Sequence, residues 1–131
     1  MEINTQSQRF PKSEHLCSRK VIERLYAEGH RLRSFPYSVQ WMVVESAVPC
    51  QVMIVAPKRR FKHAVDRNRL RRLTRESYRR QKHLLLDALR EKGVSIALSL
   101  VYFHNEALAY GQLEARMEKL LVTLAWEVAR Q

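Results

Sequence analysis

The chain has 131 residues, 46% of them apolar, and a formal net charge of +11 at pH 7, which suits one domain with a single core and an anionic partner. No run of about 18 apolar residues occurs, which argues against a membrane-spanning helix. The two cysteines, Cys17 and Cys50, form no CxxC motif and no disulfide framework.

Residues 1–14 form a polar segment that we expect to be flexible and to precede a single domain over residues 15–131. The segment has neither the apolar core nor the small-residue cleavage site of a secretory signal. Because the cysteine content also suits a reducing compartment, the sequence predicts a cytoplasmic protein. We find no internal repeat and no linker.

Three elements are predicted in the first half of the domain. Residues 18–28 have the apolar spacing of a helix, with Ser18 as its N-cap and Gly29 as a left-handed stop. Residues 37–44, YSVQWMVV, alternate in the manner of a strand. Residues 50–56, CQVMIVA, are expected to pair with that strand as a hairpin.

The second half is predicted to hold a long helix, a strand and a closing helix. Residues 66–91 contain no Gly or Pro and many good helix formers. Residues 93–103 alternate as a buried strand, and residues 112–130 have the spacing of an amphipathic helix. A further short strand can lie within residues 31–36. This order predicts an α+β fold in which helices pack on a small mixed sheet.

Positive charge is concentrated in one element. Residues 57–82 contain twelve Lys or Arg and two acids, and therefore carry +10 of the net +11. On a helical projection, a narrow stripe faces the core and most cations lie on the opposite side. The stripe consists of Leu70, Leu73, Ser77, Leu84 and Ala88, and the opposite side of Asn68, Arg71, Arg72, Arg75, Arg79 and Lys82. Arg67 and Arg69 flank the stripe.

A merely solvated helix would not favour this pattern, because like charges four residues apart destabilise a helix by roughly a few tenths of a kcal/mol. Phosphates would remove the repulsion, and arginine binds them in bidentate fashion. The strands predicted around the basic helix disfavour a helix-turn-helix that reads DNA. Binding of RNA by a sheet usually adds aromatic side chains that stack on unpaired bases. Tyr26, Phe35, Tyr37 and Trp41 could stack on unpaired bases, although alternating strand positions also suit core residues.

The sequence contains no arrangement that suggests a catalytic or metal site within the protein. We find no pair of carboxylates, no Ser/His/Asp set and no HExxH motif. The five histidines are scattered without the spacing of zinc ligands. We therefore expect no catalytic residue and no metal-binding residue in this chain.

The stretch VAPKRRFKHAVDRNRLRRLTRESYR, residues 55–79, closely resembles the central motif of the bacterial ribonuclease P protein component. In that family an RNR motif, here Arg67-Asn68-Arg69, opens a long basic helix that follows a strand and a basic loop. RKVIERLYAEGHR, nearer the N-terminus, resembles the first helix of the family. The resemblance covers about residues 15–104, and the final helix fits loosely.

The resemblance implies an αβββαβα-type two-layer sandwich with a mixed four-stranded sheet and a left-handed βαβ crossover through the basic helix, a ribosomal protein S5 domain 2-like fold. It also implies the protein subunit of the ribonuclease P endonuclease. In the family, the RNA subunit holds Mg²⁺ and cleaves precursor tRNA to form the mature 5′ end. The protein binds this catalytic RNA and the single-stranded 5′ leader, and it needs neither a membrane nor an obligatory protein partner.

Matching positions in the family imply two groups of binding residues. Those implied to bind the catalytic RNA are Lys58, Arg59, Arg60, Lys62, Arg67, Arg69, Arg71 and Arg79. Those implied to bind the leader are Asn68, Arg72, Arg75, Tyr26 and Trp41, with Tyr37 on the same strand face as Trp41. Three features depart from the family pattern. Ile22 replaces an aromatic residue, the second strand lacks its usual glycine, and the loop after the last strand, HNEALAYG, is not basic.

Two other functions remain open at the level of sequence. A non-catalytic RNA-binding protein of ribosome or ribonucleoprotein assembly would carry the same charge pattern. A basic amphipathic helix could instead bind a membrane surface or an acidic protein, although Leu70, Leu73 and Ser77 make only a modest apolar face for that role. The long motif around the basic helix favours the ribonuclease P subunit.

Overall fold

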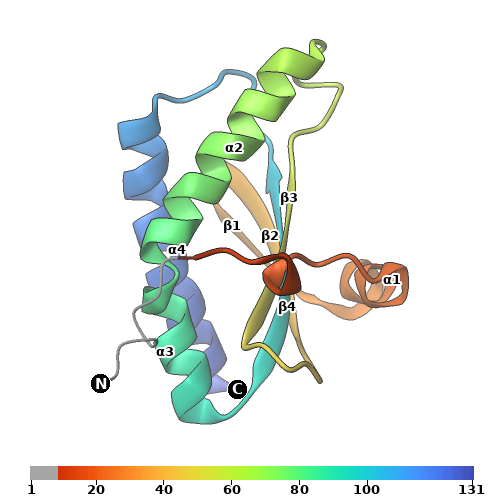
Figure 1. Ribbon diagram of the computed structural model, residues 1–131, viewed down its shortest axis with the longest axis vertical. Helices are drawn as coiled ribbons and strands as arrows, with labels where there is room; N and C mark the ends of the chain where they lie inside the picture. Colours follow the sequence, from red (N-terminus) through yellow and green to blue (C-terminus); the bar gives the residue numbers. More distant parts are fainter. Residues whose placement is uncertain (1–8) are drawn as a thin grey trace.

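The computed structural model describes residues 9–131 (Figure 1), and the part of the predicted flexible segment over residues 1–8 lies outside the described residues. The helices are α1 (Arg19–Glu28), α2 (Ala64–Gln81), α3 (His83–Lys92) and α4 (Tyr110–Arg130), preceded by a short 3-10 turn, η2 (Lys12–Glu14). The strands are β1 (His30–Ser34), β2 (Tyr37–Val44), β3 (Cys50–Val55) and β4 (Ser95–Tyr102). Each predicted strand and helix has a counterpart, and β1 overlaps the short strand expected within residues 31–36.

The four strands form one mixed sheet in the order β1-β2-β4-β3. β4 lies in its interior, antiparallel to β2 and parallel to β3. The predicted hairpin between residues 37–44 and 50–56 is wrong, because β2 lies between β1 and β4. Five successive residues of β4, Ile96–Leu100, are buried. A strand that is buried on both faces belongs in the middle of a sheet, and β4 therefore separates β2 from β3.

Helices cover both faces of this sheet. α2, α3 and α4 pack on one face over the main core, and α1 lies on the other face (Figure 1). A smaller core beneath α1 contains Leu16, Leu25, Met42 and Ala97. The parallel strands β3 and β4 are connected through α2 and α3. The predicted α+β class with a mixed four-stranded sheet is confirmed, and the left hand of the crossover stays a prediction.

The single helix predicted over residues 66–91 is instead two helices that meet at Lys82. The buried residues are Leu70, Thr74, Ser77 and Tyr78 in α2, and Leu85, Leu86 and Leu89 in α3. In one regular helix these two sets would point roughly 80° apart, so the break allows both to reach the core. Leu84 and Ala88, predicted for the core stripe, are only half-buried. Lys82, predicted on the cationic side, is buried.

Helix α1 begins and ends for different physical reasons. At the start, Ser18 Oγ accepts a hydrogen bond from the Val21 backbone N–H at 3.3 Å, as expected. At the end, Gly29 has a φ of −67°, so the predicted left-handed stop is wrong. A Cβ at this position would lie 2.5 Å from the Leu25 carbonyl oxygen. Glycine is therefore needed here for the close approach and not for its dihedral freedom.

The segment before α1 crosses the edge of the sheet and packs on the domain. The backbone N–H of Leu16 donates to the Val52 carbonyl at 2.9 Å, which covers part of the free edge of β3. The Glu14 carboxylate forms an ion pair with the buried Lys82, with 2.8 Å between Oε1 and Nζ. The contacts of the domain therefore begin before residue 15, inside the segment predicted to be flexible.

Candidate nucleic-acid interface

The outward side of α2 carries a row of cations. Asn68, Arg69, Arg72 and Arg75 line, together with Val65, a shallow depression of about 460 Å³. Positions 65, 68, 69, 72 and 75 share one side of a helix, which brings these side chains together. We call Asn68, Arg69, Arg72 and Arg75 the α2 face. The structure thus confirms that this part of the helix presents its cations on one side.

A groove lies between α2 and the N-terminal segment. It has a volume of about 220 Å³ and is lined by Phe10, His15, Arg72, Arg75, Glu76 and Arg79. The rings of Phe10 and His15 are in contact, with their centroids 4.3 Å apart. We call this the α2 groove. The sequence did not indicate either ring as part of a site, because Phe10 lies in the segment expected to be flexible and His15 is only one of five scattered histidines.

Arg79 is partly neutralised by an acid on its own helix. Its Nη2 lies 2.5 Å from Glu76 Oε2, and the hydrogen bond from Arg79 lowers the pKa of the Glu76 carboxyl. A phosphate would have to compete with this carboxylate for the guanidinium. The role of Arg79 in binding the catalytic RNA stays a prediction.

Arg67 has a structural task besides its predicted RNA contact. Its Nη1 donates to the carbonyl oxygens of Phe61 and Lys62, each at 2.8 Å, and so ties the preceding loop to the start of α2. Arg71 donates from Nη2 to Asn68 Oδ1. This bond holds the Asn68 amide in place on the α2 face.

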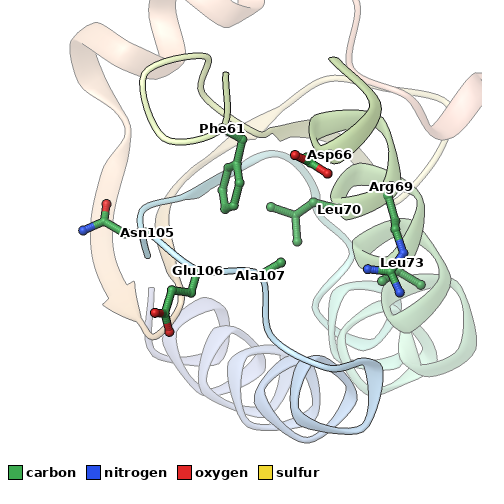
Figure 2. Close-up of a pocket in the computed structure, with 8 residues that line it drawn as sticks. All are labelled: Phe61, Asp66, Arg69, Leu70, Leu73, Asn105, Glu106 and Ala107. Atoms are coloured by element: carbon green, nitrogen blue, oxygen red, sulfur yellow. The ribbon is translucent and has the colours of Figure 1, made fainter. Parts of the chain in front are cut away.

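The remaining predicted RNA-binding cations lie in the loop between β3 and α2. Lys58, Arg59 and Lys62 are exposed. Arg60 is half-buried, and its Nη1 donates to Asn105 Oδ1 at 2.6 Å, which links this loop to the loop after β4. Figure 2 shows the pocket of about 280 Å³ between these loops and α2. It is lined by Phe61, Asp66, Arg69, Leu70, Leu73, Asn105, Glu106 and Ala107.

Trp41 and Tyr37 are not placed to stack on RNA bases, which corrects the role that the resemblance implies. Each is 1% exposed and belongs to the main core beneath α2, α3 and α4. The Tyr37 hydroxyl is hydrogen-bonded to Thr74 Oγ1 at 2.9 Å, and burial raises the pKa of Tyr37. The alternation of β2 directs both rings to the face that three helices cover.

Tyr26 lies on the other face of the sheet and remains accessible. It is 37% exposed, and its hydroxyl lies 3.0 Å from Ser99 Oγ. Ser99 is the register partner of Met53 on the edge strand β3. Met53 lines a depression together with Cys17 and Arg75. The sheet face under Tyr26 therefore leads around the β3 edge to the α2 groove.

The described residues were compared with two kinds of site, a membrane-spanning helix and a cluster of metal ligands. No helix within residues 9–131 has the length and apolar character needed to cross a bilayer. In the same part of the chain, no three His, Cys, Asp or Glu side chains gather where they could hold a metal ion. We therefore assign no described residue to Mg²⁺.

Known proteins match most of this chain. The family model for ribonuclease P matches residues 10–125. The ribonuclease P protein components from two strains of Porphyromonas gingivalis are 33% and 35% identical over 119 residues, which cover 89% of this chain and 87% of each relative. The ribonuclease P protein component of Chlorobaculum tepidum is 34% identical over 85 residues, which are 61% of this chain and 55% of the relative.

Two solved structures share the fold. The RNase P proteins of Staphylococcus aureus and Thermotoga maritima each superpose with a TM-score of 0.67 at 19% sequence identity. The superpositions cover 84% of this chain, and 94% and 96% of the two structures. With the sequence match over nearly all described residues and the cationic α2 on a shared fold, this chain belongs to the ribonuclease P protein family.

Proposed function

We propose that this chain is the protein subunit of ribonuclease P, and that it binds the catalytic RNA of that endoribonuclease and the 5′ leader of precursor tRNA. The α2 face is the observation that carries the proposal. Arg69, Arg72 and Arg75 lie side by side, and none of them forms an ion pair with a carboxylate among residues 9–131. Guanidinium groups in this state are free to bind phosphates in bidentate fashion.

We assign the catalytic RNA to the end of the molecule at which α2 begins. Lys58, Arg59 and Lys62 are exposed there, in the loop that leads into α2. The two hydrogen bonds from Arg67 to loop carbonyls support this assignment, because they hold the loop cations in a fixed relation to the helix. A fixed array of charges suits a folded RNA better than a flexible tail would.

We assign the 5′ leader to the α2 groove. Arg72 and Arg75 border both the α2 face and the groove, so they can hold the backbone of a strand that enters it. Phe10 and His15 supply the rings on which unpaired bases stack. Tyr26 extends the same path along the sheet. Phe10 and His15 thus take the place of Trp41 and Tyr37 in the leader site, and Tyr26 keeps the place that the resemblance implies.

In this proposal the RNA subunit performs the hydrolysis with Mg²⁺ that it holds itself, in the cytoplasm. The protein contributes positive charge, because two polyanions must approach each other before cleavage. The protein therefore assists the reaction by binding and orienting the RNAs, without supplying a nucleophile or a general base.

A cleavage assay at low Mg²⁺ and moderate salt tests the proposal. Purified protein is added to the RNase P RNA encoded in the same genome and to a precursor tRNA. We expect faster formation of the mature 5′ end, since the protein cations replace part of the screening that Mg²⁺ otherwise supplies. If the RNA is bound but cleavage is not accelerated, the chain is a non-catalytic RNA-binding protein and the proposal is wrong.

Arg72→Ala and Arg75→Ala test the leader assignment separately. Each should lower the affinity for leader-bearing precursor tRNA roughly tenfold, about 1.5 kcal/mol for a lost charge-assisted hydrogen bond. Affinity for mature tRNA, measured on the same holoenzyme, should change little. Arg90→Ala, on the exposed side of α3, is the matched control and should affect neither. Equal losses for precursor and mature tRNA would contradict the assignment.

A further inference from the structure

A second basic surface lies where β1 turns into β2, at the end of the sheet. We call it the Arg–Phe cluster, and it consists of Arg33, Phe35, Phe103, His104 and Arg116. Arg33 Cζ lies 4.4 Å from the centroid of the Phe103 ring, and Arg116 Cζ lies 5.1 Å from that of Phe35. Phe35 also contacts Phe103 and His104, with centroid distances of 5.9 and 4.9 Å. The β1–β2 turn, the end of β4 and α4 thus build one cluster.

The two guanidinium groups of the cluster are held without using their hydrogen-bond donors. Arg33 and Arg116 are exposed, and neither has a carboxylate partner among the described residues. Arg79, Arg90 and Arg130, in contrast, each pair with an acid three residues earlier. An ion pair occupies guanidinium N–H groups, whereas an aromatic ring contacts the guanidinium face. Arg33 and Arg116 are therefore positioned while their N–H groups face solvent.

The Arg–Phe cluster adjoins the surface that we assign to the catalytic RNA. His104 precedes Asn105, whose side chain accepts the hydrogen bond from Arg60. Figure 1 shows the start of α2 and the loop after β4 at the same end of the molecule. In Figure 2, Asn105 lies across the pocket from α2. The cations before α2 therefore continue, through Arg60, toward Arg33 and Arg116.

We propose that the Arg–Phe cluster is a second binding site for the catalytic RNA, which takes a backbone segment with an unpaired base. The two guanidinium forks suit phosphate oxygens. The half-buried rings of Phe35, Phe103 and His104 offer a surface on which a base can stack. This inference rests on the proposed function, because it adds a contact to the same RNA on elements other than α2.

The salt dependence of RNA binding tests whether Arg33 and Arg116 contact RNA phosphates. The probe is the RNase P RNA encoded in the same genome, and its affinity for full-length protein is determined from about 0.1 M salt upward. Arg33→Gln/Arg116→Gln should lower the log–log slope by about 1.5, since each lost phosphate contact removes roughly 0.7–0.9. The same loss amounts to about thirtyfold weaker binding near 0.1 M salt, shrinking toward 1 M. Arg90→Gln/Arg130→Gln, which removes two ion-paired exposed arginines, should leave the slope unchanged.

A third double variant separates failure of this inference from failure of the proposed function. Arg59→Gln/Arg69→Gln removes two exposed cations that we assign to the catalytic RNA and should also lower the slope. If it does so while Arg33→Gln/Arg116→Gln keeps the wild-type slope, the Arg–Phe cluster does not bind the RNA and only this inference falls. If wild-type protein does not bind the RNA, both proposals fall. Dimerisation of wild-type protein that Arg33→Gln/Arg116→Gln abolishes in sedimentation would make the cluster a self-contact and overturn the inference.

Two measurements avoid dependence on how the neutral variant folds. Arg33→Lys/Arg116→Lys keeps the charge but loses the planar fork, so we expect a near wild-type slope with several-fold weaker binding. Unchanged affinity would count against the site.

The second measurement uses iron-EDTA attached at position 34, through Ser34→Cys in a Cys17→Ser background. It should cleave a discrete segment of the bound RNA, whereas the same tether placed by Glu91→Cys should not. Absence of cleavage from position 34, with cleavage from a tether placed by Lys62→Cys, would overturn the inference.

Discussion

Trp41 and Gln40 are neighbours on β2 that face opposite sides of the sheet. Gln40 Nε2 donates to the Leu25 carbonyl of α1 at 3.4 Å. Trp41 is 1% exposed in the main core, and its ring lies 4.4 Å from that of His30, centroid to centroid. No base can reach Trp41 while the helices cover this face. We therefore interpret Trp41 as a structural residue and Phe10 as a residue of the α2 groove.

Substitution of Trp41 separates these two roles. Trp41→Ala should lower the free energy of unfolding by about 3–5 kcal/mol, as loss of a large buried ring does, and Trp41→Phe should lower it less. Urea unfolding provides this measurement. Trp41→Phe should also keep the wild-type ratio of precursor to mature tRNA affinity, whereas Phe10→Leu should reduce it. A change in the ratio for Trp41→Phe as large as that for Phe10→Leu would show that Trp41 contacts the leader.

Cys50 is the buried one of the two cysteines, and Cys17 is exposed. Burial raises the pKa of the Cys50 thiol from 9.0 to about 12. Between these values the unfolded chain loses the thiol proton while the folded protein keeps it. The stabilisation is therefore complete below about pH 9 and is lost as the pH rises toward 12. Burial also raises the pKa of Tyr78. The free energy of unfolding should therefore fall further at still higher pH, where the Tyr78 hydroxyl ionises in the unfolded chain.

Unfolding by urea at several alkaline pH values tests this linkage. The free energy of unfolding should fall above pH 9 by up to about 1.4 kcal/mol per pH unit for each such group. Cys50→Ala should lower stability at every pH through lost packing but give a shallower alkaline slope. Cys17→Ala, at an exposed position, should keep the wild-type slope. Identical slopes for the wild type and Cys50→Ala would contradict the assignment.

At the scale of elements, the junction of α2 and α3 anchors the N-terminal segment. Lys82 lies at the junction, and its Nζ donates to the Arg9 carbonyl and to Glu14 Oε1. The Lys82 and Glu14 side chains are 4% and 14% exposed. Phe10 follows Arg9 and packs on Tyr78, with centroids 5.4 Å apart. The helix junction therefore helps to form the α2 groove, since it holds the segment that carries two of the groove's rings.

Removal of one partner of this ion pair should be more harmful than removal of both. Lys82→Ala leaves the Glu14 carboxylate without its partner and should lower the free energy of unfolding by about 3 kcal/mol. Lys82→Met/Glu14→Leu should recover most of that loss in urea unfolding. Lys92→Ala, at an exposed position, is the control and should change stability little. Because Lys82 is buried, the double variant should also keep the wild-type salt dependence of RNA binding. A reduced log–log slope would show that Lys82 contributes to the cationic surface after all.

At the scale of the whole molecule, charge and core are segregated. The segment with twelve Lys or Arg is attached to the core through the buried residues of α2, while Arg69, Arg72 and Arg75 line the outward depression on α2. Repulsion among these cations opposes folding, and tertiary packing overcomes it. A bound polyanion should therefore stabilise the folded protein by neutralising the repulsion as well as by mass action.

Thermal unfolding with and without RNA tests this expectation. RNase P RNA at about 100 times its Kd should add roughly 2.7 kcal/mol to the stability of the wild-type protein and raise its Tm. The gain should vanish near 1 M salt, where phosphate contacts are weak. Arg69→Gln/Arg72→Gln/Arg75→Gln should show a higher Tm than the wild type without RNA and a smaller gain with it. An equal gain in the triple variant would show that other residues bind the RNA.

Much of the fold follows from local patterns in the sequence. The helix over residues 18–28 and the strand over residues 37–44 were predictable because an apolar period of 3.6 or 2 belongs to an element by itself. The one-sided row of Asn68, Arg72 and Arg75 on α2 was predictable for the same reason, since a helix fixes the relative directions of its own side chains. The long motif around these residues also indicated the family.

The tertiary structure decided which elements are neighbours, and with that the composition of the site. Residues 50–56 follow residues 37–44 in the sequence, but the strongly buried β4 lies between these two strands in the sheet. The choice of sheet face likewise turned Trp41 into a core residue, although alternation alone suits either face. Phe10 gained a role because Lys82 and Glu14, distant in sequence, hold its segment against α2. Local periodicity fixes directions within an element, whereas burial depends on contacts between elements, which only the folded chain brings together.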